Sequence, residues 1–178
     1  MTTKRRNSKS SKHNYDCSHI SSVFELDSVK KIIPQAAKLL KGMKFDAIAF
    51  RGMSGCLFAA PLALRLRKPL LMVRKPCACP SSTHTKMKVE GDINAQTYII
   101  VDDFIGTGRT VREIISTLQQ WAEFDDRSLK CIGVLTAFRI SRTFKECTYR
   151  PLSVEGFKLA EPETAMKGQD KYKGEVYP

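Results

Sequence analysis

The stretch Tyr98–Val111, YIIVDDFIGTGRTV, is the most informative part of the sequence for both the fold and the chemistry. A run of apolar and aromatic residues leads directly into two adjacent carboxylates, Asp102 and Asp103, and a small, flexible turn follows. The predicted strand 97–101 is apolar or aromatic from Tyr98 onward, as expected of a strand that is covered on both faces. Residues 111–124 repeat apolar side chains at helical spacing. The stretch therefore predicts a strand, a turn and a helix.

The turn has the composition of an anion-binding loop. A helix start carries free backbone N–H groups and positive potential from the macrodipole. The residues around that start supply flexibility, hydroxyl groups and a positive charge: Gly106, Thr107, Gly108, Arg109 and Thr110. Asp102 and Asp103 suit sugar hydroxyls, or a magnesium ion that carries another phosphate. The combination predicts a sugar phosphate ligand; the structural alternative is a strand–turn–helix connection with capping aspartates.

Other anion-binding motifs fit poorly. The chain has no GxxxxGK[ST] sequence, which excludes a Walker loop, and GTGRTV lacks the third glycine of the dinucleotide fingerprint. Two carboxylates directly before the loop would also repel a pyrophosphate placed there. A nucleotide-binding loop of either kind is therefore disfavoured.

The remaining sequence predicts an α/β fold with a parallel sheet flanked by helices. In such sheets, ligands bind beyond the carboxyl ends of the strands, where both the 51–55 turn and the loop after Asp103 lie. The predicted elements are a helix at 27–42, a strand at 45–50, a turn at 51–55, a helix at 56–67, a strand at 69–73, a polar stretch at 74–96, a strand at 97–101, a helix at 111–124 and a strand at 129–138.

The composition describes a globular chain with anionic partners. Its 178 residues, of which 42% are hydrophobic, are enough to bury a core. No window approaches the about 18 apolar residues of a membrane span, and the N-terminus lacks the apolar segment of a secretory signal, so we expect a cytoplasmic location without membrane contact. The six cysteines are then free thiols, and Cys77 and Cys79 are too close for the usual zinc pair. The net charge of +12 points to phosphates, nucleotides or nucleic acid.

The N-terminal residues 1–14 form a basic arm that we expect to be disordered. They hold five Lys and Arg residues, no acidic residue and almost no apolar side chain. The arm is either a solubilising tail or a weak, non-specific nucleic-acid contact. Residues 15–178 are predicted to form the catalytic or binding domain.

The quoted stretch resembles the phosphoribosyl pyrophosphate-binding motif of the type I phosphoribosyltransferases. That motif is an apolar strand, two acidic residues, two further residues and a Thr/Gly-rich turn. The resemblance implies that Asp102 and Asp103 hold the ribose hydroxyls and that residues 106–110 hold the 5-phosphate. It also implies Mg²⁺ carried by the substrate near the two aspartates, with no other protein metal site, and a homodimer.

Two further segments fit this family. Its pyrophosphate loop follows the first core strand, which here gives Arg51, Gly52, Met53, Ser54 and Gly55. Its flexible loop, which closes over the site, precedes the motif strand, where this chain has the polar stretch 74–96. The resemblance assigns Arg51, Arg74 and Lys75 to the leaving pyrophosphate. The alternatives without a functional role are an ordinary strand-to-helix turn at 51–55 and a solvated strand end at Arg74 and Lys75.

The resemblance also bears on the acceptor base. Members that act on hypoxanthine and guanine have a carboxylate where this chain has Gly106, whereas a small residue is usual in adenine- and orotate-type members. The run GTGRTVR is close to the bifunctional uracil phosphoribosyltransferase and pyrimidine-operon regulator, and the segment 51–75 looks more adenine-type. The family's small, variable hood reads the base, and here it would come from about 15–26 and 139–178. Phe138 is a candidate for stacking on the base, or else a core residue.

The resemblance leaves two functions open. One is a phosphoribosyltransferase of nucleotide salvage, in which a nucleobase, with an adenine-type purine favoured, displaces pyrophosphate from phosphoribosyl pyrophosphate. The other is a regulator on the same fold that senses phosphoribosyl pyrophosphate and binds RNA or DNA. A phosphoribosyl pyrophosphate synthetase is disfavoured because that family needs two such domains.

Overall fold

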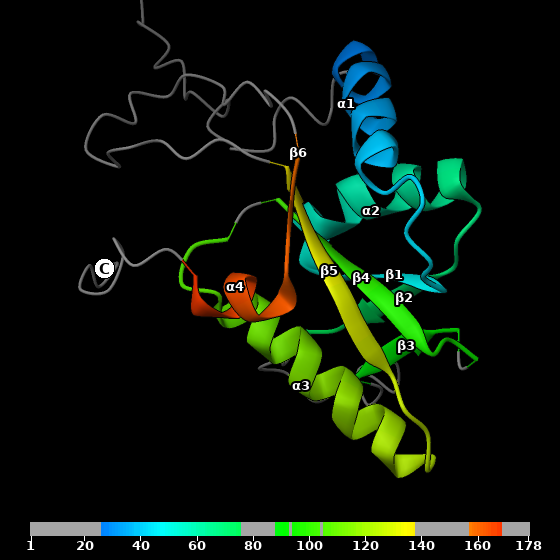
Figure 1. The fold of residues 1–178 in the computed structure, drawn as a ribbon, viewed down its shortest axis with the longest axis vertical. Helices are drawn as coiled ribbons and strands as arrows, with labels where there is room; N and C mark the ends of the chain where they lie inside the picture. Colours follow the sequence, from blue (N-terminus) through cyan, green and yellow to red (C-terminus); the bar gives the residue numbers. More distant parts are fainter. Residues whose placement is uncertain (1–25, 76–87, 93, 104, 138–156, 169–178) are drawn as a thin grey trace, which may run out of the picture.

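The computed structural model describes residues 26–75, 88–92, 94–103, 105–137 and 157–168 (Figure 1). Its centre is a sheet of strand order β3-β2-β1-β4-β5-β6. The elements are α1 (Leu26–Leu39), β1 (Ala47–Arg51), α2 (Gly52–Leu66), β2 (Leu70–Val73), β3 (Val89–Gly91), β4 (Thr97–Asp102), α3 (Arg109–Phe124), β5 (Lys130–Ala137), β6 (Phe157–Ala160) and α4 (Pro162–Lys167).

The predicted parallel sheet is confirmed in its four central strands. β1 pairs in parallel with β2 and with β4, and β4 pairs in parallel with β5. Two short antiparallel strands were not predicted, and they form the two edges: β3 pairs with β2, and β6 pairs with β5. The sheet is therefore mixed only at its edges, which is common in large α/β sheets.

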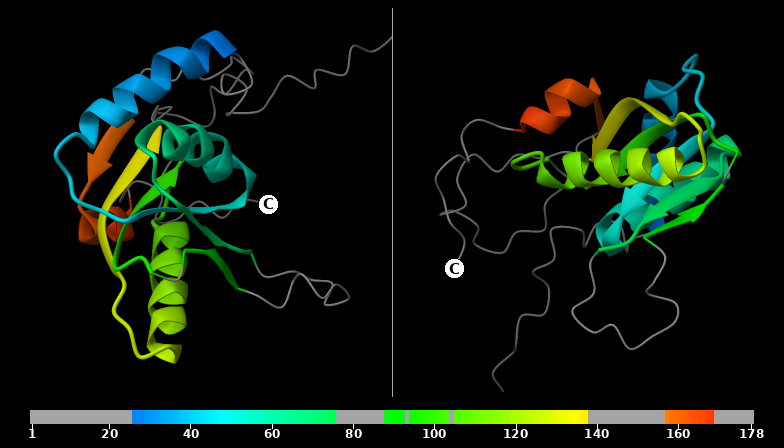
Figure 2. Two further views of the ribbon diagram at one scale, coloured as in Figure 1. Left: turned by 90° about the vertical axis from the view of Figure 1, so that its right-hand side faces the viewer. Right: turned by 90° about the horizontal axis from the view of Figure 1, so that it is seen from below.

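Helices cover both faces of the sheet, which explains the continuously apolar strands. Alternate residues of β1 face opposite sides: Ile48 and Phe50 pack with α1 and α2, whereas Ala47 and Ala49 pack with α3. The views in Figure 2 show α3 on the side of the sheet away from α1 and α2. This arrangement follows from right-handed connections on the two sides of the sheet.

The structure corrects the sequence prediction for residues 51–55. The segment 51–55 was expected to be a turn, but Arg51 is the last residue of β1 and Gly52 already begins α2. Gly52 makes the change of direction possible with a φ of +72°, a conformation that glycine adopts without a steric penalty. The backbone N–H groups at this position therefore belong to a helix start rather than to a free loop.

Several predicted features lie outside the described residues. These are the basic arm, most of the polar stretch 74–96, Phe138 and the larger part of the expected hood. Within the expected hood, the described residues 157–168 add β6 to the main sheet and place α4 beside β5 and α3. No described helix combines the length and the hydropathy that a membrane span requires.

Helix α2 offers a direct test of where the core lies. Leu62 is fully buried against the sheet, whereas Leu64, on the opposite side of α2, is 82% exposed. We expect Leu62→Ala to lower the free energy of unfolding by about 2–5 kcal/mol, because it removes buried contacts and leaves a cavity. The matched change Leu64→Ala should cost less than about 0.5 kcal/mol. Urea unfolding of both variants measures the difference; equal losses would contradict the packing of α2.

Candidate functional site

The candidate site lies where the strand connections diverge. From β1 the chain passes through α2 to β2, on one side of the sheet, and from the adjacent β4 it passes through α3 to β5, on the other. Crevices form at such a switch point, beyond the carboxyl ends of the strands. Arg51 ends β1 and Asp102 ends β4, so both predicted site residues lie at the strand ends that border this switch point.

Buried polar side chains gather at the same edge. Within the described residues, the buried polar or charged side chains are those of Arg51, Asp102, Asp103 and Thr136, which are 4–9% exposed. Thr136 lies opposite Asp102 in the register of β4 and β5. Burying charge is costly unless it is compensated, so this concentration marks a functional edge. Sequence reasoning did not select Thr136, because a lone threonine in an apolar strand carries no distinctive signal.

The two aspartates interact directly with each other. The Asp103 backbone N–H donates a hydrogen bond to Asp102 Oδ1 over 3.0 Å. Burial, with a smaller contribution from the neighbouring Asp103 carboxylate, raises the pKa of Asp102 to about 8, and the Lys75 ammonium opposes this rise. Without a ligand, the pair therefore retains a proton at neutral pH, and a ligand that donates hydrogen bonds or brings positive charge would release it.

Lys75 and the first turn of α2 lie beside this pair. A Cβ atom placed on Gly52 would lie 3.3 Å from Lys75 Nζ, and one on Gly55 would lie 3.7 Å from Asp102 Oδ1. α2 begins without a side-chain cap or an acidic residue in its first turn, so its N-terminal N–H groups remain open to an anion. The predicted residues Met53 and Ser54 lie in the same turn, where Met53 is largely exposed.

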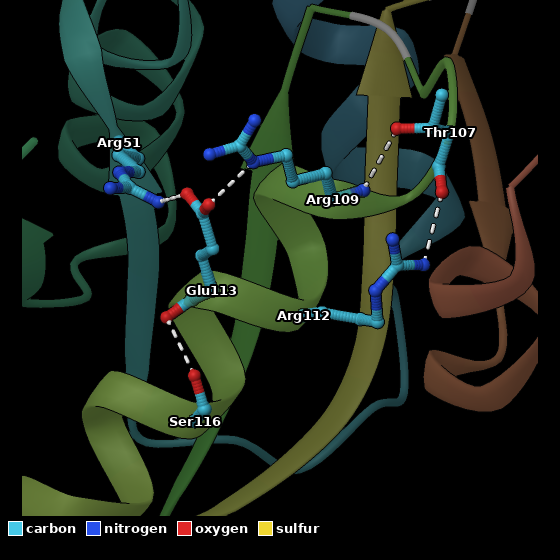
Figure 3. A network of polar contacts seen from close by, with 6 residues as sticks. All are labelled: Arg51, Thr107, Arg109, Arg112, Glu113 and Ser116. Atoms are coloured by element: carbon cyan, nitrogen blue, oxygen red, sulfur yellow. Dashed lines mark hydrogen bonds and ion pairs between the residues drawn. The ribbon is translucent and has the colours of Figure 1, made fainter.

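The predicted phosphate loop leads into a second open helix start. Gly108 precedes α3 with a φ of +71°, and α3 likewise has no side-chain cap and no acidic residue in its first turn. The Arg109 N–H contacts Thr107 Oγ1 at 3.4 Å (Figure 3). Thr110 follows in the first turn of α3, and Gly106 precedes Thr107 in the loop. Two helix N-termini with open N–H groups thus lie near the aspartates, and a helix N-terminus is a favourable site for a phosphate group.

Helix α4 packs directly against the phosphate loop. Arg112 Nη1 donates hydrogen bonds to the Thr107 carbonyl oxygen, at 3.0 Å, and to the Met166 carbonyl oxygen. A Cβ atom on Gly108 would approach Ala165 O to 2.6 Å, and one on Gly168 would approach Gly106 O to 2.6 Å. This contact fixes the loop from outside the site. It was missed in the sequence, because nothing in the composition of 162–168 relates it to the loop.

A carboxylate on α3 joins two of the predicted arginines. Glu113 Oε2 accepts a hydrogen bond from Arg51 Nη1, and Glu113 Oε1 accepts one from Arg109 Nε at 2.7 Å (Figure 3). The Arg109 guanidinium, together with that of Arg51, holds the pKa of Glu113 below its usual value. Glu113 was not selected from the sequence, although its i,i+4 spacing from Arg109 is the signal that would have found half of the network.

Arg74 is the predicted residue that the structure sets apart. Its Nε donates to Glu90 Oε1 on β3 over 2.5 Å, which ties β2 to the edge of the sheet. Lys75 instead lies at Gly52 and Asp102. The structure thus brings together Arg51, Lys75, both aspartates and the 105–110 loop, while the described contact of Arg74 is structural. The predicted base-stacking residue Phe138 lies outside the described residues.

Comparison with known proteins identifies the family. Residues 19–143, more than half of the chain, match the family described as the phosphoribosyl transferase domain. The chain belongs to this family. The resemblance of the motif after β4 is thereby confirmed at the level of the family, and the phosphoribosyltransferase domain includes every described element from α1 to β5.

Relatives match this phosphoribosyltransferase domain over part of their length. The adenine phosphoribosyltransferase of Ureaplasma parvum serovar 3 is 35% identical over 104 residues, which are 52% of this chain and 60% of that protein. The adenine phosphoribosyltransferase of Caldanaerobacter subterraneus subsp. tengcongensis is 38% identical over 91 residues, which are 44% of this chain and 53% of that protein. The match to these relatives thus spans three fifths of their length or less.

A solved structure supports the fold alone. The structure of Leishmania donovani UMP synthase superposes with a TM-score of 0.52 at 22% identity, covering 66% of this chain and 23% of that chain. The described part of this chain contains no cluster of three or more His, Cys, Asp or Glu side chains suited to a metal. The Asp102–Asp103 pair fits Mg²⁺ held jointly with a substrate, since Mg²⁺ is commonly bound by one or two carboxylates and substrate phosphates.

The raised pKa of Asp102 predicts a stability change with pH. Between about pH 4 and pH 8 the folded state holds a proton that the unfolded chain has released, so the free energy of unfolding falls as the pH rises. We expect Asp102→Asn to remove this slope, of up to about 1.4 kcal/mol per pH unit, and to stabilise the ligand-free protein at pH 8.

Thermal and urea unfolding at pH 5 and pH 8 measure this effect. The exposed Asp126 provides a matched control, because Asp126→Asn removes a carboxylate in a left-handed conformation that asparagine also adopts. An unchanged pH slope in Asp102→Asn would show that Asp102 is ionised in the folded protein at neutral pH.

Proposed function

We propose that the chain transfers the 5-phosphoribosyl group from phosphoribosyl pyrophosphate to a nucleobase, with release of pyrophosphate. The observation that carries this proposal is the placement of two uncapped helix N-termini on either side of a buried aspartate pair. Phosphoribosyl pyrophosphate has the complementary arrangement: a 5-phosphate at one end, two hydroxyl groups in the middle and a pyrophosphate at the other end. Membership of the phosphoribosyl transferase domain family supports the same activity.

Each part of the site has a role in binding this substrate. The N–H groups from Gly106 to Thr110 and the Thr107 hydroxyl bind the 5-phosphate. Asp102 and Asp103 accept hydrogen bonds from the ribose hydroxyls, which position the sugar C1 over the crevice. The first turn of α2, with Arg51 and Lys75, binds the pyrophosphate.

The reaction is a displacement at C1. The bond from C1 to the pyrophosphate oxygen breaks, and that oxygen keeps the electron pair. A ring nitrogen of the base forms the new bond to C1, and the base releases its N–H proton to the leaving pyrophosphate or to water. Lys75 and the N–H groups of α2 stabilise the charge that develops on the leaving oxygen. Bound Mg²⁺ would neutralise part of the pyrophosphate charge.

An adenine-type purine is the favoured acceptor. Relatives at 31–38% identity are adenine phosphoribosyltransferases, although they match over about half of this chain. Gly106, in the loop before α3, is consistent with this choice because it offers no carboxylate to a 6-oxopurine. A cytoplasmic location, a role in nucleotide salvage and assembly as a homodimer are parts of the same proposal.

The substrate is tested by pyrophosphate release. We expect release from phosphoribosyl pyrophosphate and Mg²⁺ with adenine, and not with guanine, hypoxanthine, xanthine, uracil or orotate. The double change Asp102→Asn with Asp103→Asn should weaken phosphoribosyl pyrophosphate binding by calorimetry and leave the fold intact, because it removes the acceptors for the ribose hydroxyls.

A second adjacent aspartate pair provides the control for this test. Asp125 and Asp126 are exposed at the end of α3, and their change to asparagine removes the same charge without reaching the site. Release with another base would correct the acceptor. Unchanged binding in the Asp102 and Asp103 variant would contradict the assignment of the site.

A regulator that senses phosphoribosyl pyrophosphate is the second candidate, favoured by the net charge of +12 and by the basic arm. Deletion of residues 1–14 separates the two functions. An enzyme should keep its turnover number, whereas a regulator should lose affinity for RNA or DNA and the salt dependence of that binding. Fluorescence anisotropy with a labelled oligonucleotide at two salt concentrations, beside the pyrophosphate assay, makes the distinction.

A further inference from the structure

Glu113 holds both of the arginines that flank the proposed substrate site. Arg51 ends β1 on the pyrophosphate side, and Arg109 begins α3 on the 5-phosphate side. Each oxygen of the Glu113 carboxylate accepts from a different arginine, Oε2 from Arg51 and Oε1 from Arg109 (Figure 3). One carboxylate therefore occupies donors at both ends of the site, as the oxygens of phosphate groups would.

The burial of these groups shows what the carboxylate does. Arg51 is 7% exposed, and its Nε is buried with no hydrogen-bond partner among the described residues. A buried guanidinium without a counter-ion would be strongly destabilising, so Glu113 compensates a charge that the fold cannot leave alone. The Glu113 side chain is 37% exposed, so its carboxylate can be hydrated by solvent when it withdraws from the arginines.

Glu113 is also placed where it does not cap α3. It lies beyond the first turn, which contains no acidic residue, so the free N–H groups at the helix start stay open. The carboxylate thus competes with a phosphate for the guanidinium groups but not for the backbone donors. Two guanidinium groups against one carboxylate leave a net positive charge that still attracts an anion.

We propose that Glu113 is an internal anion that takes the place of substrate phosphates on Arg51 and Arg109 in the ligand-free protein and yields both arginines when phosphoribosyl pyrophosphate binds. This inference rests on the proposed function. It makes Glu113 a residue that tunes substrate affinity: it keeps the ligand-free fold stable and weakens the binding of each phosphate end.

The test uses two probes that each fill one end of the site. Inorganic pyrophosphate with Mg²⁺ reports on the Arg51 end, and ribose 5-phosphate reports on the Arg109 end. Glu113→Gln should bind each probe roughly three- to tenfold more tightly by calorimetry, because a nearby negative charge has been removed. The same variant should melt at a lower temperature without ligand, because Arg51 loses its counter-ion.

Two further variants make the result specific. Glu123→Gln removes the same charge from an exposed position near the end of α3 and should change neither dissociation constant. Glu113→Asp keeps the charge but is one methylene shorter, so it cannot hold both arginines in the same way. It should fold normally and tighten ribose 5-phosphate binding by less than Glu113→Gln does.

The outcomes distinguish this inference from the proposed function. Weaker or unchanged binding of both probes by Glu113→Gln, with normal binding by the unmodified chain, would overturn the inference and leave the proposed function intact; weaker binding would mean that Glu113 only orients the arginines. Failure of the unmodified chain to bind either probe would overturn the proposed function, and the inference with it.

Discussion

The burial of two adjacent carboxylates at the end of β4 determines what the surrounding site must supply. Asp102 and Asp103 are each less than a tenth exposed, so solvent cannot stabilise their charges. The raised pKa of Asp102 keeps a proton on the pair, which removes one negative charge. Lys75 and the open start of α2, which lie beside Asp102, stabilise the remaining charge. The stable compensation is a ligand with hydroxyl donors and an accompanying cation, which is the chemistry we propose for the substrate.

The same edge shows how local backbone geometry creates the two anion sites. Gly52 and Gly108 each have a positive φ. Gly52 turns the chain from the end of β1 into α2, and Gly108 turns it from the loop after β4 into α3. The N-cap residues, Arg51 and Gly108, make no side-chain cap hydrogen bond, and neither first turn contains an acidic residue, so most of the N-terminal N–H groups remain open to an anion. α4 then supports one of these starts through Arg112, which joins the Thr107 and Met166 carbonyl oxygens. Rigid support matters because a loop that binds phosphate through backbone N–H groups cannot correct a misplaced donor by moving a side chain.

Much of this arrangement could be predicted from the sequence, for identifiable reasons. Continuous apolar runs gave the four parallel strands, and two carboxylates after one of them indicated the site, since both signals are local. The edge strands were missed because each is only three or four residues long, and their pairing depends on partners far along the chain. Arg74 and Lys75 could not be distinguished either, because both are basic residues that directly follow β2, and only the structure shows that Arg74 reaches Glu90.

The charges of the site are balanced internally before any substrate is present. The aspartate pair has Lys75 nearby, and the two flanking arginines share Glu113. Such pairing stabilises the folded chain, because an uncompensated buried charge costs several kcal/mol. It also lowers affinity, because every internal contact must be exchanged for one with the ligand, and only the difference contributes to binding. Unpaired arginines in a positively charged protein would bind any free phosphate without selectivity. Internal counter-ions favour a ligand that replaces several of them at once. The substrate that we propose, phosphoribosyl pyrophosphate, has charge at both ends and hydroxyl groups between, and would meet that requirement where a single phosphate would not.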